Sequence, residues 1–402
     1  MRTVRTLNLF SADDSPVPCP PPWRPGALPR NSPRAAPAVT AGLAACLLVA
    51  ALSTPGCVWE LGREHPERSR MGEVVNDCIV PLPPGLEAWG APVSLEYPDR
   101  SLWIWVDATV AGGAPLRNVG AFVSSAAAAC RGELDFVTGA DGVPEPLISR
   151  TAEERAEDVA RSDGRRTELA ITGGFVHEGR GYAYYEKILA GPGIFDAVAV
   201  GTGLCVIDAP GQRCERTMPG TEPREPTLLW GGGGRPLDRG AFVAADGFAY
   251  VWGCLHAAAF LDPCSAARVA PEEAADPAAY RFAGWDGEWL EDGGNAGAVF
   301  DNPGAVTPGF NAFLGRYTAV TANIWDATIE LRQAGEPGSG YDDPVWLFNA
   351  VPPADWFIGG GVEHAALATE GGRTIAVSYY TNASGAQQGL HLVRFRFAQG
   401  SE

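Results

Sequence analysis

The segment SLWIWVDATV (residues 101–110) decides the fold, because its pattern of a turn residue followed by an aromatic and β-branched strand returns four more times. The five copies start 80, 66, 68 and 57 residues apart, which is the size of a four-stranded propeller blade with its loops. The pattern therefore predicts an all-β chain that folds as a five-bladed β-propeller. The other copies are GYAYYEKIL (181–189), GFAYVWGCL (247–255), GRYTAVTAN (315–323) and GRTIAVSYY (372–380).

Each of the last four copies continues into a further strand-like run, and turn pairs such as Asp246-Gly247 favour hairpins between them. The competing architecture is a jelly roll or a pair of β-sandwiches, but strands spaced by about 8–12 residues give no reason for an aromatic strand to return at these intervals. The helix-like stretch 151–161 is predicted as a surface excursion between blades one and two. The further runs lie at residues 195–207, 265–270, 327–334 and 389–397.

Composition and charge restrict the possible partners. The 402 residues include 50 Gly, 34 Pro and 12 Trp, which is typical of a turn-rich globule with aromatic cores. The formal net charge is −18, and residues 1–56 carry a net +3, so the remainder is near −21. Such a chain repels phosphate backbones, which excludes nucleic acid and favours neutral or basic partners. We expect a monomer, and we attribute the presence of one lysine, Lys187, to coding bias.

An export signal is predicted near the N-terminus. Residues 35–52 form an apolar run that follows several arginines and precedes STPGC (53–57). Gly56-Cys57 resembles the lipobox of bacterial lipoproteins, in which the cysteine is lipidated; ordinary signal cleavage is the alternative. We expect residues 1–57 to form a signal peptide and lipid anchor region, 58–77 a linker and 78–402 the propeller. The chain would then be exported to the periplasm or the outer-membrane or cell surface.

Six further cysteines follow Cys57, and an even number in an exported chain favours disulfides over metal ligation. Short separations predict two local bonds, which leaves a third pair to close the first blade; buried free thiols are the alternative. The predicted pairs are Cys205–Cys214, Cys254–Cys264 and Cys78–Cys130.

Polar residues are predicted to gather at the axis of the propeller. The inner strand of a blade should precede the repeated strand by one hairpin, and counting back about eight or nine residues reaches polar groups in four blades. Convergent polar groups of this kind form the default hypothesis for a binding site. The candidates for binding substrate are Asp238, Arg239, Glu363 and His364, with Thr172 and Thr307 at equivalent positions.

Asp107 and Glu87 are the candidate catalytic carboxylates. Asp107 ends a strongly apolar strand, where its charge requires a polar mouth or a partner, although a turn-forming Asp is the alternative. Hydrolysis of a glycosidic bond needs two carboxyls, one protonated and one ionised. Aromatic side chains such as Trp89, Trp252 and Trp285 are candidates for stacking on sugar rings, with inter-blade core as the alternative.

Several segments also resemble a known family. In order along the chain, they match the bacterial propeller family called domain of unknown function 4185, which is similar to arabinanase-type five-bladed propellers. The resemblance covers roughly residues 80–399. The matching segments are WIWVDAT (103–109), ARV (267–269), AYRF (279–282), GWDGEW (284–289), FNAFLGRY (310–317), TIELRQA (328–334), GRTIAVSYY (372–380) and LHLVRF (390–395).

The resemblance implies a glycan-active protein, since some members of the family are inverting endo-D-arabinanases that use aspartates of the first blade. By position, Asp107 matches the motif aspartate, and Asn311 lies in a matching segment and joins the candidates for binding substrate. The earlier aspartate of the family has no clear match, so a non-catalytic platform that binds carbohydrate or protein is the alternative. No cofactor is expected, and calcium is suggested by analogy with related propellers alone.

Overall fold

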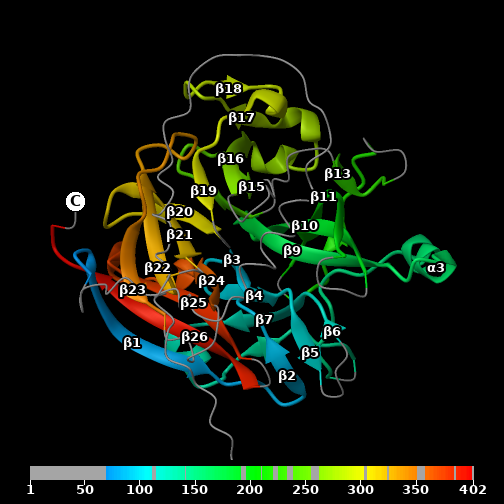
Figure 1. The fold of residues 1–402 in the computed structure, drawn as a ribbon, viewed down its shortest axis with the longest axis horizontal. Helices are drawn as coiled ribbons and strands as arrows, with labels where there is room; N and C mark the ends of the chain where they lie inside the picture. Colours follow the sequence, from blue (N-terminus) through cyan, green and yellow to red (C-terminus); the bar gives the residue numbers. More distant parts are fainter. Residues whose placement is uncertain are drawn as a thin grey trace, which may run out of the picture. The chain divides into compact units, whose positions relative to one another are not determined.

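The computed structural model describes most of the chain after residue 68 and forms a five-bladed β-propeller (Figure 1). The predicted fold class is confirmed. The export signal, Cys57 and Asp238 lie outside the described residues. The structure describes residues 69–110, 115–140, 142–191, 196–209, 211–220, 225–232, 239–254, 262–302, 306–323, 326–350, 358–383 and 386–400.

Each blade is an antiparallel sheet whose strands follow one another outward from the axis. Blade one contains β3 (Val93–Glu96), β4 (Ser101–Trp105), β7 (Val119–Val123) and β8 (Asp135–Phe136). Blade two contains β9 (Arg166–His177), β10 (Arg180–Ala190), β11 (Val198–Ile207), β12 (Glu215–Arg216) and β13 (Leu228–Gly231). Blade three contains β14 (Gly240–Val243), β15 (Ala249–Cys254), β16 (Asp262–Val269), β17 (Arg281–Ala283), β18 (Trp289–Leu290) and β19 (Phe300–Asn302).

Blades four and five complete the ring, and a small sheet lies beside blade one. Blade four contains β20 (Val306–Asn311), β21 (Arg316–Asn323), β22 (Thr328–Ala334) and β23 (Val345–Asn349). Blade five contains β24 (Ile358–Glu363), β25 (Thr374–Ala383), β26 (Ala386–Phe397) and β1 (Gly72–Val80). The small sheet contains β2 (Leu86–Trp89), β5 (Ala108–Val110) and β6 (Pro115–Leu116). Helices are short: α2 (Ala126–Cys130), α3 (Ala152–Ala160) and the 3-10 turns η1 (Pro271–Glu273), η2 (Pro277–Ala279), η3 (Gly293–Asn295), η4 (Ala365–Leu367) and η5 (Glu370–Gly372).

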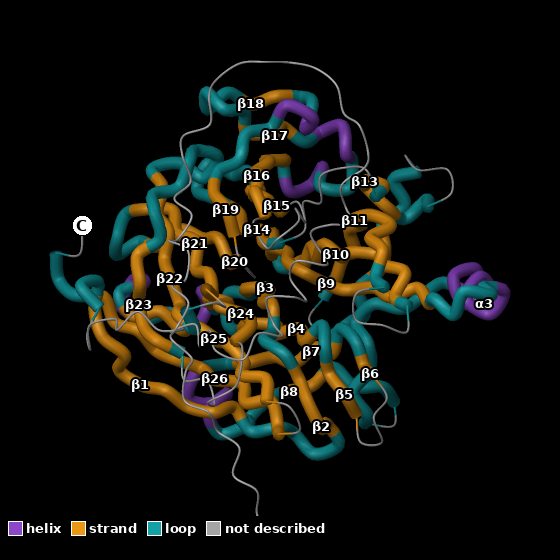
Figure 2. Tube along the Cα trace, viewed as in Figure 1, coloured by secondary structure: helices purple, strands orange, loops and turns teal. Residues whose placement is uncertain are grey.

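The five copies of the repeated pattern form the second strands β4, β10, β15, β21 and β25, so the inner strand precedes each by one hairpin, as predicted. The inner strands β3, β9, β14, β20 and β24 contact one another in that order around the centre (Figure 2). Glycines permit this approach. A Cβ atom on Gly173 would lie 2.8 Å from the backbone nitrogen of Gly240, and one on Gly240 would lie 2.5 Å from Cδ of Pro308.

The hydrophobic core of the described residues consists of five clusters, and each lies between two successive blades. Successive side chains of a strand point to opposite faces of its sheet. β4 therefore sends Leu102 and Ile104 toward blade two, and it sends Trp103 and Trp105 toward blade five. A strand buried on both faces has no reason to alternate with polar residues, which explains the continuous apolar run that defines the repeat.

The ring closes through the first described strand. β1 is the outermost strand of blade five and pairs with β26, from Gly72 opposite Phe397 to Val80 opposite Leu390. β1 thus includes residues 72–77, which belong to the segment 58–77 that we predicted as a linker. The disulfide Cys78–Cys130 joins β1 to the end of α2 in blade one. We predicted that this bond closes the first blade, but it links blade five to blade one because β1 belongs to the last sheet.

The other two predicted disulfides also form, each within one blade. Cys205–Cys214 joins β11 to the loop before β12, and Cys254–Cys264 joins β15 to β16. Three disulfides indicate an oxidising compartment, extracellular or periplasmic. Of the helices in the described part of the chain, none has both the length and the apolar character needed to span a membrane.

Candidate functional site

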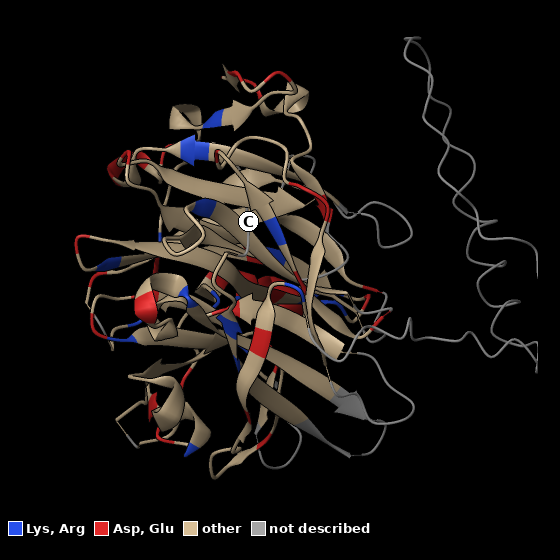
Figure 3. Ribbon diagram, turned by 90° about the vertical axis from the view of Figure 1, so that its left-hand side faces the viewer, with Lys and Arg blue, Asp and Glu red and all other residues tan. Residues whose placement is uncertain are grey.

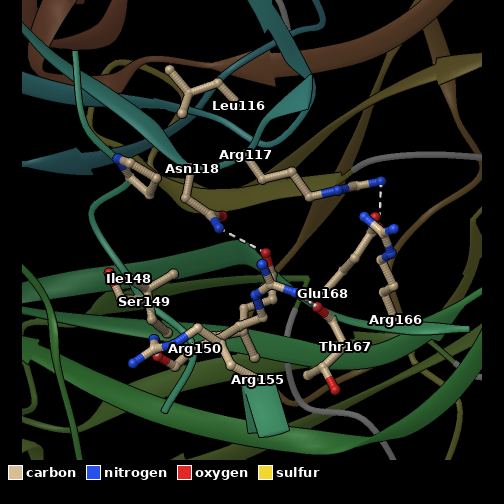
Figure 4. A pocket seen from close by; sticks show the side chains of 12 residues that line it. Leu116, Arg117, Asn118, Ile148, Ser149, Arg150, Arg155, Arg166, Thr167 and Glu168 are labelled. Atoms are coloured by element: carbon tan, nitrogen blue, oxygen red, sulfur yellow. Dashed lines mark hydrogen bonds and ion pairs between the residues drawn. The ribbon is translucent and has the colours of Figure 1, made fainter. Parts of the chain in front are cut away.

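A cavity of about 470 Å³ lies between blades one and two, at the end where their inner strands begin (Figure 4). Its wall is formed by the residues before β7, the loop that leads into α3, and the start of β9. Apolar side chains such as Leu116 and Ile148 share this wall with charged groups. A concave site of this size with a few polar groups is typical of small-molecule binding. The charged lining residues are Arg117, Arg150, Arg155, Arg166 and Glu168.

Asp107, the predicted catalytic carboxylate, forms an ion pair with Arg117, which lines this cavity. It follows β4, and its side chain is 72% exposed. Its Oδ1 accepts a hydrogen bond of 2.8 Å from Nη1 of Arg117, while Nη2 of the same guanidinium lies 2.7 Å from Oε2 of Glu168. Arg117 thereby joins carboxylates of blades one and two. Because the guanidinium is a rigid planar fork, the two engaged oxygens lie within about 8 Å of each other.

The second carboxylate at this site is Glu168, which the sequence analysis did not identify. β9 has 12 residues, so counting back from the repeat reached Thr172 in its middle instead of Glu168 near its start. The available signal was the polar run 165–168 directly before an apolar strand. Glu87 is an exposed residue of β2, and the structure brings Asp107 together with Glu168 instead. A catalytic role for Glu87 stays a prediction.

Asn118 fixes one wall of the cavity. It is buried, and its backbone has a φ of 59°, a left-handed conformation that Asn tolerates better than most residues. Its Nδ2 donates to the carbonyl oxygen of Leu169 and its Oδ1 accepts from the backbone N–H of Ile171, both at 2.7 Å. The side chain thus takes the place of a strand partner along β9 and holds blade one against the inner strand of blade two.

A buried ion network anchors α3, which carries Arg155, to the outer strands of blade two. Glu154 accepts hydrogen bonds of 2.8 and 2.9 Å from Arg216, and Nζ of Lys187 lies 2.9 Å from its Oε1. Lys187 also pairs with Glu225, so two cations balance two carboxylates. Burial would raise the pKa of Glu154, but the hydrogen bonds from Arg216 and Lys187 lower it to about 2. The chain's lysine therefore has a structural role that coding bias did not predict.

A second set of bonds ties α3 to the start of β9. Oδ1 of Asp158 accepts hydrogen bonds from the backbone N–H and the hydroxyl of Thr167, at 2.8 and 2.9 Å. Its Oδ2 pairs with Nη1 of Arg150 at 2.8 Å. Arg155 donates to the carbonyl oxygen of Arg150. The helix confirms the predicted excursion between blades, and these bonds fix two arginines on the cavity wall.

The other described candidates for binding substrate belong to blades three, four and five. Arg239 lies directly before β14, at the end where the inner strands begin. Asn311 ends β20, where its Nδ2 donates to the carbonyl oxygen of Gly372 at 2.9 Å and its Oδ1 accepts from the backbone N–H of Leu314 at 3.0 Å, which is a structural arrangement. Glu363 ends β24, and His364 follows it. Inner strands begin at the cavity end, so these last three residues lie at the opposite end of the propeller.

Three of the aromatic candidates for stacking on sugar rings lie among the described residues. Trp89 and Trp252 are fully buried in the inter-blade core, as the alternative interpretation predicted. Trp285 is exposed but lies between β17 and β18, on the outer strands of blade three. The stacking role is therefore not supported for Trp89 and Trp252.

Glu363, His364 and Glu96 form a buried group between blades one and five, which we call the seam cluster. Burial and the charge of Glu96 raise the pKa of Glu363 to about 7, and burial also raises the pKa of Glu96. Burial lowers the pKa of His364 to about 3. Its Nε2 lies 2.8 Å from Oγ of Ser378, and its ring stacks on Trp103 with centroids 4.3 Å apart. These contacts indicate a structural histidine.

The described residues do not bring together three or more His, Cys, Asp or Glu side chains in positions that could hold a metal ion. Calcium prefers six to eight oxygen ligands. At the cavity, Asp107 and Glu168 are engaged by Arg117 instead, so the donor set that the analogy with related propellers requires is not assembled there.

Comparison with known proteins supports the fold. No family model and no curated protein matches the chain. The solved structures that it resembles include the GH43_1 enzyme from Xanthomonas citri complexed with xylose, with a TM-score of 0.51, 13% identity, and coverage of 82% of this chain and 92% of that chain. The same enzyme complexed with xylotriose gives a TM-score of 0.50, 13% identity, and coverage of 81% and 92%. Similarity at this level of identity establishes the propeller fold alone.

Proposed function

We propose that this chain is a glycan-binding propeller whose ligand occupies the cavity between blades one and two. The observation that carries the proposal is the cavity itself, about 470 Å³ with apolar walls and several guanidinium groups. Guanidinium groups present fixed, planar sets of donors that suit the hydroxyl and carboxylate oxygens of sugars. The fold is that of enzymes solved with xylose and xylotriose, which supports a glycan as the ligand.

Binding fits the geometry better than hydrolysis does. A two-carboxylate hydrolase needs one carboxyl that donates a proton to the leaving oxygen. Asp107 and Glu168 are both engaged by the permanently charged Arg117. The carboxyls with raised pKa values, Glu96 and Glu363, are at the other end of the inner strands. The non-catalytic alternative is therefore the better supported one.

Binding can be tested by calorimetry with arabinan, xylan and other oligosaccharides. Ser149 is an exposed residue of the cavity lining, so Ser149→Trp should fill the cavity and lower the affinity at least tenfold. Ser124→Trp is a matched control, because Ser124 is exposed at the opposite end, next to the strand end where Val123 pairs with Ser101. An unchanged affinity in Ser149→Trp, or no binding of any glycan by the wild type, would refute the proposal.

Hydrolysis remains a second candidate, favoured by one observation. Asp107 and Glu168 contact the same guanidinium, so their engaged oxygens lie within about 8 Å of each other, and paired carboxylates that cleave glycosidic bonds are separated by about 5–10 Å. The assay is release of reducing ends from arabinan and related furanosides by the wild type, Asp107→Asn and Glu168→Gln. Activity in the wild type that both substitutions abolish would establish the candidate, and activity that neither changes would exclude these residues.

We further propose that the chain is an exported lipoprotein, lipidated at Cys57, and a distant relative of the domain of unknown function 4185 family. The three disulfides support export, and the order of the matching segments supports the relationship. A lipidated product should enter the detergent phase in a phase-partition experiment, whereas Cys57→Ser should stay in the aqueous phase. Equal partition of the two proteins would argue for ordinary signal cleavage.

A further inference from the structure

We propose that the cavity between blades one and two selects an acidic sugar and that Arg166 and Arg155 hold the carboxylate of a uronic acid residue. This inference rests on the proposed function, because it names the class of glycan that the same cavity takes. It also departs from the overall charge of the chain, which predicted neutral or basic partners.

The charges around the cavity do not cancel. Its lining contains four arginines and one glutamate. The ion-pair partners outside the lining add two carboxylates, Asp107 on Arg117 and Asp158 on Arg150. Four positive groups thus face three negative ones, and one positive charge is left over. A single carboxylate would complete the balance, whereas a phosphate dianion would exceed it.

Within the described part of the chain, Arg155 and Arg166 form no ion pair, although the charge of Arg155 also acts on the carboxylate of Glu153. Arg166 is exposed at the start of β9, and within the described part of the chain its guanidinium makes no hydrogen bond or ion pair. In Figure 4 it points toward the ion pair of Arg117 with Glu168. Arg155 is exposed on α3, and one of its nitrogens donates to the carbonyl oxygen of Arg150. A guanidinium has five N–H donors, so both side chains keep donors for a ligand.

The positions of these arginines are held from several directions. Glu154 and Asp158 anchor α3 to the outer strands of blade two and to β9, and Asn118 holds β9 against blade one. A cavity with walls fixed in this way loses little conformational freedom when a ligand binds. A carboxylate would form charge-assisted hydrogen bonds with a guanidinium, and the neutral part of the sugar would pack against Leu116 and Ile148.

The rest of the molecule offers a contrast. The chain has 48 acidic residues against 30 basic ones, and in Figure 3 acidic and basic residues are interspersed along the strands and loops. An anion that approaches is therefore repelled at long range and attracted only close to the cavity. Salt should weaken the long-range repulsion more than the short-range attraction, because ions at 0.1 M ionic strength screen charges that lie more than about 10 Å apart.

The test is calorimetric binding of trigalacturonate and of a glucuronic-acid-substituted xylo-oligosaccharide, each compared with its methyl ester. At low salt we expect at least one acid to bind at least tenfold more tightly than its ester. Arg166→Gln and Arg155→Gln should each reduce that preference at least threefold, because the affinity for the acid should fall more than the affinity for the ester. Arg281→Gln is the matched control, because Arg281 is a surface residue of blade three that pairs with Glu291.

The outcomes separate this inference from the proposed function. If acid and ester bind equally well and Ser149→Trp weakens both, the cavity binds glycans and the inference on acidic sugars is wrong. If a preference for acid exists but Arg166→Gln and Arg155→Gln leave it unchanged, the assigned residues are wrong and the inference fails. If no neutral or acidic glycan binds, the proposed function fails together with the inference.

Discussion

The two ends of the propeller handle buried and half-buried charge in opposite ways. At the cavity end, arginine or lysine contacts the carboxylates of Asp107, Glu154 and Glu168, and hydrogen bonds from Arg216 and Lys187 lower the pKa of Glu154. In the seam cluster, no cation among the described residues pairs with Glu96 or Glu363, and burial raises the pKa of both. At the cavity end, arginines keep N–H donors that a ligand can use. At the seam cluster, carboxyls with raised pKa values can be buried between the blades. The difference suggests that the first end serves binding and the second serves closure of the ring.

The largest effect is expected from breaking the ion network at the cavity end. Glu154→Ala would leave Lys187 and Arg216 buried with one remaining carboxylate, Glu225. Removing one partner from a buried ion pair typically costs about 3–5 kcal/mol of unfolding free energy. Urea denaturation should show this loss, and the affinity for acidic sugars should fall as α3 loses its anchor. Glu157→Ala on the same helix, whose residue is exposed and pairs with Arg161, should cost under about 0.5 kcal/mol; similar losses in the two variants would contradict the comparison.

The seam cluster should produce an intermediate effect that depends on pH. Glu363 has a pKa of about 7, above its ordinary value of 4.5, so its contribution to stability is complete below pH 4.5 and is lost as pH rises toward 7. Glu363→Gln should remove this loss and gain on the order of 2 kcal/mol at pH 8 relative to pH 4.5. His364 acts in the opposite sense, since its pKa of about 3 means that stability is lost as pH falls from 6.5 toward 3. Urea denaturation between pH 4 and 8 measures both slopes, and equal slopes in the wild type and Glu363→Gln above pH 4.5 would remove Glu363 from this role.

The smallest effect on stability is expected for Arg117→Gln. The arginine side chain is 30% exposed and its partner Asp107 is 72% exposed, and ion pairs of this kind contribute under about 1 kcal/mol. Binding should respond much more strongly, because Asp107 and Glu168 would then present uncompensated negative charge to the ligand. Thermal unfolding and calorimetry on the same sample separate the two effects. A large loss of stability with unchanged affinity would mean that Arg117 serves the fold and not the cavity.

The sequence was sufficient for the features that repeat. Five aromatic strands gave the blade number and the position of the inner strands, and cysteine separations gave three correct disulfide pairs. It was insufficient where a feature depends on strand length or on pairing across the chain. Because β9 has 12 residues, counting back from the repeat did not reach Glu168. Because Gly72 pairs with Phe397, Cys78 lies in the last blade.

The direction of the inner strands was the other feature that could not be predicted from the sequence. Counting back from each repeat gave described residues on an inner strand or directly beside one, but Asp107 lies beyond the end of a second strand and Glu363 lies at the end of an inner strand. Because the inner and second strands of each blade are antiparallel, Asp107 and Glu363 lie at opposite ends of the propeller. These two groups therefore do not belong to one site.

The pairing of β1 with β26 also constrains the order in which the sheets of the propeller can be completed during folding. Residues 72–80 are synthesised early, but their partner strand lies at residues 386–397, so the fifth sheet cannot be completed until almost the whole chain is available. Contacts between such distant segments form slowly in folding because a very long loop must close. The Cys78–Cys130 bond joins β1 of the last sheet to α2 of blade one, so the rate at which it forms during refolding should report completion of the ring.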